Sequence, residues 1–137
     1  MDGEEVMLGL KERPGQHLAR LQALYDAAPV GLAFVDCNLR YVSLNRCLAE
    51  MHRLPVGMHI GRTVTEILPD LFEQIAPLLQ RALTGEPVTE CVVRDLAPDG
   101  SSSRRIYRVS YCPARDVAGE IVGISVAVID LGWALSA

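Results

Sequence analysis

The sequence predicts an α+β domain in which helices are inserted between the second and third strands of an antiparallel sheet. Two short β-rich runs, residues 31–36 and 40–44, flank a tight polar turn and form a predicted hairpin. Residues 45–83 carry helix signals, with apolar side chains at helical spacing. Three runs between residues 88 and 130 alternate apolar and polar side chains, as strands with one buried face do.

A helix over residues 16–28 is expected before the sheet. Its apolar residues recur at helical spacing and form a narrow stripe, which suits packing on a sheet or on a partner helix. Pro29 ends this helix, because a proline disfavours helical backbone in the residue before it. Residues 1–15 are polar and end in a Pro-Gly breaker, so we expect a flexible leader there. The stripe consists of Leu18, Leu21, Leu24, Tyr25 and Ala28.

The inserted segment predicts two short helices and one long helix. Asn45 is a good N-cap for a short helix that ends near His52, and Thr63 suits the same role for a helix over residues 64–68. A longer apolar helix follows and ends at a Gly-Glu-Pro stop. Pro77 lies inside it and predicts either a kink or the first turn of a fresh helix.

The last three strands are predicted at residues 88–96, 105–112 and 120–130, with turn residues between them. The final strand has one face of branched apolar side chains and one face of small side chains. The branched face carries Val122, Ile124, Val126 and Val128, and the small face carries Gly123, Ser125 and Ala127.

Composition and charge narrow the function classes. The chain has 137 residues, half of them hydrophobic and only 5% aromatic, which fits one aliphatic globular domain. A net charge of −4 argues against a nucleic-acid surface. The longest apolar run, residues 121–129, is too short to span a bilayer, and no signal peptide is visible. The four cysteines form no Cys-x-x-Cys pair, so we expect free thiols in the cytoplasm.

The order of these elements resembles a PAS domain, a small sensory α+β module, over residues 24–132. The Gly61-Arg62 turn, the stop at residues 85–87, the Asp99-Gly100 turn and the closing Asp130-Leu131 fall where a PAS domain has them. The resemblance implies a five-stranded antiparallel sheet in the order B-A-I-H-G. Strands A and B are the first two runs, and G, H and I are the last three.

The resemblance also implies the organisation and role of the chain. The PAS domain itself would cover residues 29–132, and residues 133–137 would begin a connector to an output domain that this chain lacks. That output would be a histidine kinase, a nucleotide cyclase or a DNA-binding transcription regulator. PAS domains usually sense and do not catalyse, so we expect no enzyme activity, no direct nucleic-acid contact and no membrane segment.

PAS ligands lie between the inner face of the sheet and the inserted helices. A ligand here should be small and largely apolar or aromatic, anchored by hydrogen bonds from Tyr107 and Tyr111. Plain core packing is the alternative role for each of these positions. The candidate lining is Ala33, Val35, Ile60, Val64, Ile67, Leu68, Ala76, Leu79, Leu83, Cys91, Val93, Tyr107, Val109, Tyr111, Ile124, Val126 and Val128.

Two family cofactors are not expected. Val64 stands where the covalent flavin domains carry their reactive Cys, and Val128 stands where they carry a flavin-contacting Gln. The resemblance does not imply a haem, because haem PAS domains use a His on the long helix or nearby and no His lies between Pro69 and Gly85. A metal site is not expected either, since Pro55 separates His52 from His59, and we expect both histidines at the surface.

Assembly remains open at the level of sequence. PAS modules commonly pair, so we expect a homodimer in which the N-terminal stripe (Leu18, Leu21, Leu24, Tyr25) meets the small face of the last strand (Gly123, Ser125, Ala127). The alternative is that the same two surfaces pack on each other within one chain. A ligand-free dimerisation module is the alternative function. A small cone-shaped α+β isomerase is a more remote one, with Asp95 as its nearest candidate acid or base.

Overall fold

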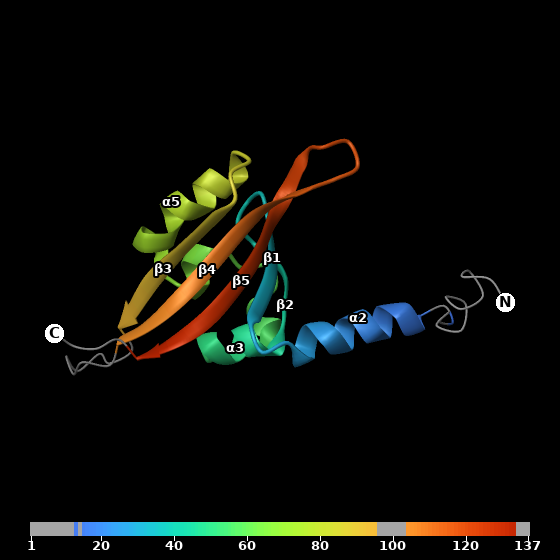
Figure 1. The fold of residues 1–137 in the computed structure, drawn as a ribbon, viewed down its shortest axis with the longest axis horizontal. Coiled ribbons are helices and arrows are strands. Elements are labelled where there is room, and N and C mark those ends of the chain that lie inside the picture. Colours follow the sequence, from blue (N-terminus) through green and yellow to red (C-terminus); the bar gives the residue numbers. More distant parts are fainter. Residues whose placement is uncertain (1–12, 14, 96–103, 134–137) are drawn as a thin grey trace.

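The computed structural model describes residues 13, 15–95 and 104–133, and it shows one five-stranded antiparallel sheet (Figure 1). The order across the sheet is β2-β1-β5-β4-β3, which confirms the predicted order B-A-I-H-G. The strands are β1 (Gly31–Asp36), β2 (Tyr41–Leu44), β3 (Val88–Asp95), β4 (Arg104–Arg115) and β5 (Ile121–Trp133).

The inserted helices cover one face of this sheet and leave the other face open (Figure 1). They and the N-terminal helix are α2 (Gln16–Ala27), α3 (Arg46–His52), a 3-10 turn (Val56–Met58), α4 (Val64–Ile67) and α5 (Phe72–Leu83). α5 is one continuous helix with Pro77 inside it. Among the described residues, no helix has both the length and the apolar character that a membrane crossing requires.

The core lies between the helices and the inner face of the sheet. Register sets that face: on the central strand β5, Val126 pairs with Ala33 of β1, and Val128 pairs with Val109 of β4. All four of these side chains are buried, as is Leu79 on the facing side of α5. Of the branched face predicted for the last strand, Ile124, Val126 and Val128 are buried. Val122 is 44% exposed, because the register of β4 and β5 shifts beside it.

Asn45 joins three elements at the edge of the core. Its side chain is fully buried and makes four hydrogen bonds. The Oδ1 atom accepts from the backbone N–H of Leu32 at 2.9 Å and of Leu48 at 3.1 Å, and the second of these is the predicted N-cap contact. The Nδ2 atom donates to the carbonyl oxygens of Tyr25 at 2.8 Å and Val30 at 2.9 Å, which ties the end of α2 to the sheet.

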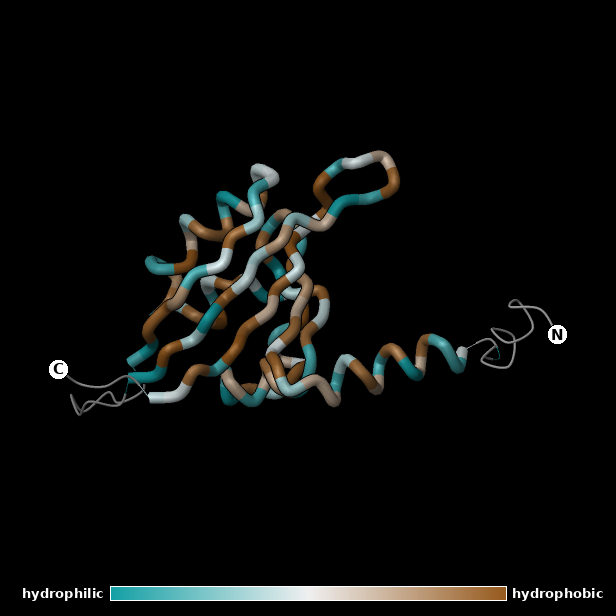
Figure 2. The backbone as a smooth tube through the Cα atoms, in the orientation of Figure 1, coloured by the Kyte–Doolittle hydropathy of each residue, from teal (hydrophilic) through white to brown (hydrophobic). Residues whose placement is uncertain are grey.

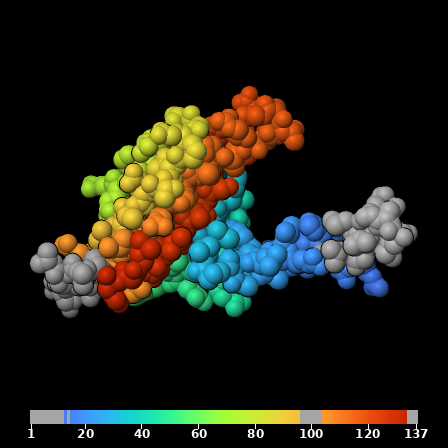
Figure 3. Space-filling view, viewed as in Figure 1, coloured from blue at the N-terminus to red at the C-terminus, as the bar shows by residue number. Residues whose placement is uncertain are grey.

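Helix α2 extends away from the domain as an arm (Figures 1 and 3). None of its residues is buried, and Leu18, Leu21 and Leu24 are 70%, 49% and 62% exposed. Figure 2 shows apolar and polar residues following one another along the helix, and the exposed fractions show that its leucines face solvent. The Tyr25 hydroxyl, 3.0 Å from the Ser43 hydroxyl, holds only the last turn.

The small residues of β5 do not all lie open on the outer face. A Cβ on Gly123 would clash with the carbonyl oxygen of Val35 and with the ring of Phe34, so Gly123 is small because its own neighbours in β1 cover it. Ser125 is exposed and Ala127 is half-buried. Within one chain, α2 does not lie on this outer face.

Candidate ligand-binding cavity

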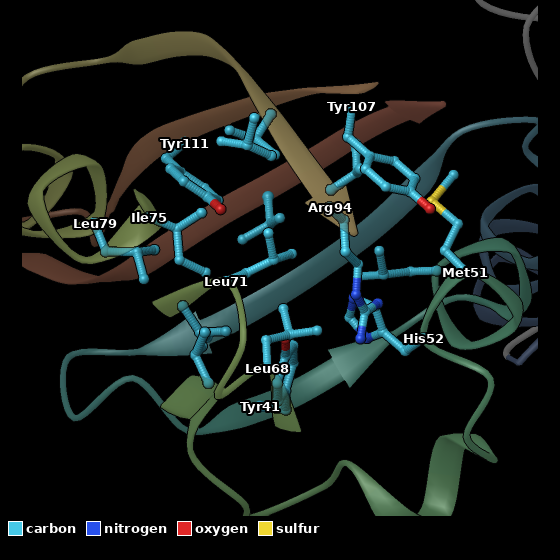
Figure 4. Close-up of a pocket in the computed structure, with 17 residues that line it drawn as sticks. Tyr41, Met51, His52, Leu68, Leu71, Ile75, Leu79, Arg94, Tyr107 and Tyr111 are labelled. Atoms are coloured by element: carbon cyan, nitrogen blue, oxygen red, sulfur yellow. The ribbon is translucent and has the colours of Figure 1, made fainter. Parts of the chain in front are cut away.

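A small cavity lies between the inner face of the sheet and helices α3, α4 and α5 (Figure 4). Its volume is about 40 Å³, which is enough for a few water molecules or a compact organic group. Its lining is Val35, Tyr41, Leu48, Met51, His52, Val64, Leu68, Leu71, Ile75, Leu79, Val92, Arg94, Tyr107, Val109, Tyr111, Val126 and Val128.

The structure brings together only part of the lining that the sequence predicts. The residues placed on the cavity wall are Val35, Val64, Leu68, Leu79, Tyr107, Val109, Tyr111, Val126 and Val128. Ala33 and Ile124 are buried in the core beside the cavity, and Ile67, Ala76 and Leu83 are half-buried. Ile60, Cys91 and Val93 are exposed to solvent.

Strand β3 presents the opposite face to the one predicted. Val92 is buried and lines the cavity, whereas Val93 is 40% exposed on the outer face with Cys91. Because side chains alternate along a strand, choosing the wrong face moves every residue. An ion pair with Asp70 lets the charged side chain of Arg94 lie on the inward face, at the edge of the cavity.

Eight lining residues were not predicted, and they belong to β2, α3, β3 and the first part of α5 with the turn before it: Tyr41, Leu48, Met51, His52, Leu71, Ile75, Val92 and Arg94. One signal was available for two of them. Leu71 and Ile75 are eight and four positions before Leu79, so they share its face of the helix and of the turn leading into it. The polar members of the set, His52 and Arg94, had no such signal.

Three tyrosine hydroxyls belong to the buried lining. Tyr41, Tyr107 and Tyr111 are 4%, 6% and 5% exposed, and within the described part of the chain their hydroxyls make no hydrogen bond. Figure 4 shows the hydroxyls of Tyr41 and Tyr111 directed toward the interior from different sides of the cavity. Burial raises the pKa of the Tyr41 and Tyr111 phenols well above their ordinary value, so both keep their protons. Each can therefore donate and accept a hydrogen bond inside the cavity.

A stacked histidine pair lies at the cavity, with His52 in its wall and His59 behind it, and this corrects the interpretation of both residues as surface histidines. His59 is fully buried, and its ring stacks on that of His52 with centroids 5.1 Å apart. Tyr41 meets the His59 ring edge-on at 5.4 Å. Pro55 places the chain so that residues on separate segments come together, which helix periodicity does not reveal.

Hydrogen bonds determine which nitrogens of the pair carry protons. His59 Nδ1 lies 2.9 Å from the carbonyl oxygen of Pro55, which only accepts, so Nδ1 carries a proton and donates. Burial lowers the pKa of His59, so its Nε2 has a free lone pair and accepts from His52 Nδ1 at 2.9 Å. Burial, with help from His59 and Arg94, lowers the pKa of His52 to about 3. Neutral His52 is left with an unprotonated Nε2, which is an acceptor.

Arg94 closes the polar end of the cavity. Its Nε donates to Asp70 Oδ2 at 2.9 Å and its Nη2 to Asp70 Oδ1 at 3.4 Å. The Arg94 side chain is 16% exposed and that of Asp70 is 44% exposed, so the ion pair lies at the boundary between cavity and solvent. Figure 4 shows the guanidinium of Arg94 beside His52. The cavity thus has a polar end at Arg94 and His52 and an aliphatic wall formed by α5 and the sheet.

The residues present do not fit a flavin or a haem. Val64 and Val128 line the cavity and offer no thiol and no amide. A volume of about 40 Å³ also has no room for a tricyclic ring or a porphyrin while these side chains hold their positions. Among the described residues, no group of His, Cys, Asp and Glu is arranged to hold a metal ion.

Comparison with known proteins agrees with this architecture. The PAS fold family profile matches residues 25–132. Among solved structures, the chain is similar to VqmA of Vibrio cholerae in a complex with ligand and DNA (24% identity, TM-score 0.69, 83% of this chain and 50% of that chain). It is also similar to the PAS domain of a Colwellia psychrerythraea protein (16%, TM-score 0.68, 85% and 98%) and to that of Bordetella pertussis BvgS (21%, TM-score 0.63, 85% and 88%).

At these identities the structural likeness shows the fold. The chain spans about half the length of that VqmA chain, and another VqmA structure with similar coverage is bound to DPO. The family match is the stronger statement, because it extends from the last turns of α2 to the end of β5. The chain belongs to the PAS fold family.

Proposed function

We propose that this chain is a sensory domain that binds a small molecule in the inner cavity and passes the binding event to an output domain. The observation that carries the proposal is the cavity itself, with three buried tyrosine hydroxyls that have no partner among the described residues. A buried polar group without a partner costs about 1–3 kcal/mol, and a bound molecule that satisfies it recovers that energy. Binding therefore couples directly to the stability of the fold.

The role we propose is regulatory and not catalytic. The output would be a histidine kinase, a nucleotide cyclase or a DNA-binding module. The DNA-binding output has support from VqmA, which shares the fold and whose structure was solved in a complex with DNA and a ligand. We place the protein in the cytoplasm, because the four cysteines are all free thiols. The isomerase alternative loses its candidate residue, since Asp95 is exposed and does not line the cavity.

Native mass spectrometry of protein purified from its own host tests this proposal. The expected result is a mass above that of the polypeptide, lost on denaturation. Tyr111→Phe removes one cavity hydroxyl and should lower the occupied fraction. Ser125→Ala removes a hydroxyl from the exposed outer face and should leave the occupied fraction unchanged. A polypeptide mass alone, from protein never exposed to denaturant, would contradict the proposal.

A second candidate is a dimerisation module, and the exposed stripe of α2 favours it. Leu18, Leu21 and Leu24 are all about half exposed or more on an arm that its own domain does not cover. The sheet's outer face also exposes Val93 and Ile129, which are 40% and 38% exposed. A partner's arm laid on this face would cover both apolar surfaces.

Sedimentation velocity tests this second candidate, because it distinguishes a dimer from a monomer. Leu21→Asp should shift a dimer to a monomer, whereas Ala23→Asp, which adds the same charge to the same helix off the stripe, should not. A monomer at high protein concentration would contradict dimerisation without affecting the ligand proposal.

A further inference from the structure

We infer that the cavity takes a small neutral molecule whose polar edge carries a hydrogen-bond acceptor next to a donor, as a primary amide or a lactam does. The inference deepens the proposed function and rests on it. The polar edge would lie against Arg94 and His52, and the remainder of the molecule against the aliphatic wall of α5 and the sheet (Figure 4).

Arg94 requires an acceptor on the ligand. The Nε and Nη2 atoms of its guanidinium are engaged by Asp70, at 2.9 and 3.4 Å, whereas its Nη1 makes no hydrogen bond to the described residues. A guanidinium has only donors, so whatever faces the free side of this group in the cavity must accept. A carbonyl oxygen meets that requirement.

His52 requires a donor on the ligand. The chain of hydrogen bonds from Pro55 through His59 holds the proton of His52 on Nδ1. The other nitrogen, Nε2, then presents a lone pair, because no hydrogen bond among the described residues uses it. An N–H group beside the carbonyl of the ligand meets that requirement. In a primary amide or a lactam, the C=O and one N–H point to the same side, as this pair of side chains requires.

The charge of the site favours a neutral ligand. Arg94 and Asp70 form an ion pair that sums to zero, and the histidine pair is uncharged. A carboxylate bound here would be an additional buried negative charge whose only cation is already paired. A neutral acceptor makes the same hydrogen bond to Arg94 without that cost.

The size of the cavity and its tyrosines limit the rest of the molecule. A volume of about 40 Å³ suits a compact group and excludes large rings. Tyr41 and Tyr111, each at most 5% exposed and without a partner among the described residues, can bond to the second lone pair or the second N–H of an amide.

Three guests of one shape test the inference by NMR titration of methyl-labelled protein. Propionamide has the acceptor and the donor, butanone has the acceptor alone, and propionate replaces the amide with a charge. Methyl signals of Leu79, Val109 and Val126 report occupancy of the cavity, because these residues line it. Propionamide should bind about tenfold more tightly than either of the others, which corresponds to about 1.4 kcal/mol and lies in the range for leaving a buried hydrogen-bonding group unpaired.

Variants on one strand supply the matched control. Arg94→Met removes the donor while keeping the aliphatic stem, and it should lower propionamide affinity at least about tenfold. Val93→Thr changes the adjacent residue, whose side chain faces outward, and should leave the affinity unchanged. Retained tight propionamide binding in Arg94→Met would overturn the role of Arg94.

Xenon separates failure of the inference from failure of the proposed function, because it enters small apolar cavities without hydrogen bonds. Equal or tighter binding of butanone or propionate overturns the neutral donor–acceptor edge and leaves a ligand-binding cavity in place. If xenon shifts the methyl signals and none of the three organic guests does, the donor–acceptor edge is likewise overturned and the cavity is still shown to admit a guest. If no guest, xenon included, shifts these methyl signals, the cavity admits no molecule and both the inference and the proposed function fail.

Discussion

The two faces of the sheet differ in the kind of group that is left without a contact. The inner face has its apolar side chains covered by α3, α4 and α5. The groups there that have no hydrogen-bond partner within the described part of the chain are polar: three tyrosine hydroxyls, one edge of Arg94 and Nε2 of His52. On the outer face and on the arm of α2 the apolar side chains are the uncovered groups, led by Leu18 and Leu24. The inner face is therefore suited to a small polar guest, and the outer surfaces to another protein surface.

Two leucines give the sharpest comparison of these regions. Leu79 is 1% exposed on the cavity side of α5, whereas Leu21 is 49% exposed on the arm. Leu79→Ala should lower the free energy of unfolding by about 2–5 kcal/mol, because it leaves a cavity in the core. Leu21→Ala should cost less than about 0.5 kcal/mol in dilute protein. Urea denaturation at low concentration measures both, and equal effects would contradict the comparison.

The histidine pair should make the inner face sensitive to acid. The pKa of His52 is lowered from 6.5 to about 3 in the folded protein, so between these values the unfolded state binds more protons. Stability is then complete above about pH 6.5 and falls as the pH decreases toward 3. The groups that act on His52 are His59 and Arg94, which lower its pKa, and Asp70, which raises it.

From about pH 7 to about pH 5, His52 alone should remove about 2 kcal/mol from the free energy of unfolding. Burial also lowers the pKa of His59, so that residue acts in the same direction. Urea denaturation at the two pH values measures the loss. His52→Gln keeps a donor for His59 but does not titrate, so it should reduce the loss. A loss of the same size in this variant would show that His52 is not its source.

Much of the fold could be predicted from the sequence, because the local sequence signals of these elements agree with the burial of their residues. The β1–β2 hairpin, the Asn45 and Thr63 caps and the alternation along β5 all pointed to the elements observed. The site was less accessible, because its polar end is built from long-range pairs. Arg94 faces inward only because Asp70, 24 positions away, pairs with it. No periodicity in the sequence encodes that contact.

Tyr111 offers a test in which a lost hydroxyl should do no harm. Its hydroxyl is buried and has no partner among the described residues, so Tyr111→Phe should leave the ligand-free protein equally stable or up to about 1 kcal/mol more stable. Thermal or urea denaturation of protein stripped of small molecules measures this. A loss of about 1 kcal/mol or more would mean that the hydroxyl is already satisfied by the protein.

The smallest effect concerns the faces of β3. Cys91 is exposed on the outer face, so iodoacetamide should modify it in the folded protein, together with Cys37 and Cys112. Cys47 should react more slowly, because it is half-buried and burial raises its thiol pKa. Mass spectrometry of tryptic peptides resolves the four sites. A Cys91 that reacts only after unfolding would restore the inward orientation predicted from the sequence.

The central claim is that the inner face encloses a site for a small polar molecule. A high-resolution crystal structure of the protein purified from its own host tests this claim most directly. We predict non-protein electron density within hydrogen-bond distance of Arg94 and of at least one of the hydroxyls of Tyr41, Tyr107 and Tyr111. Side chains closed on one another, with these hydroxyls bonded to protein atoms and no space left between them, would contradict it.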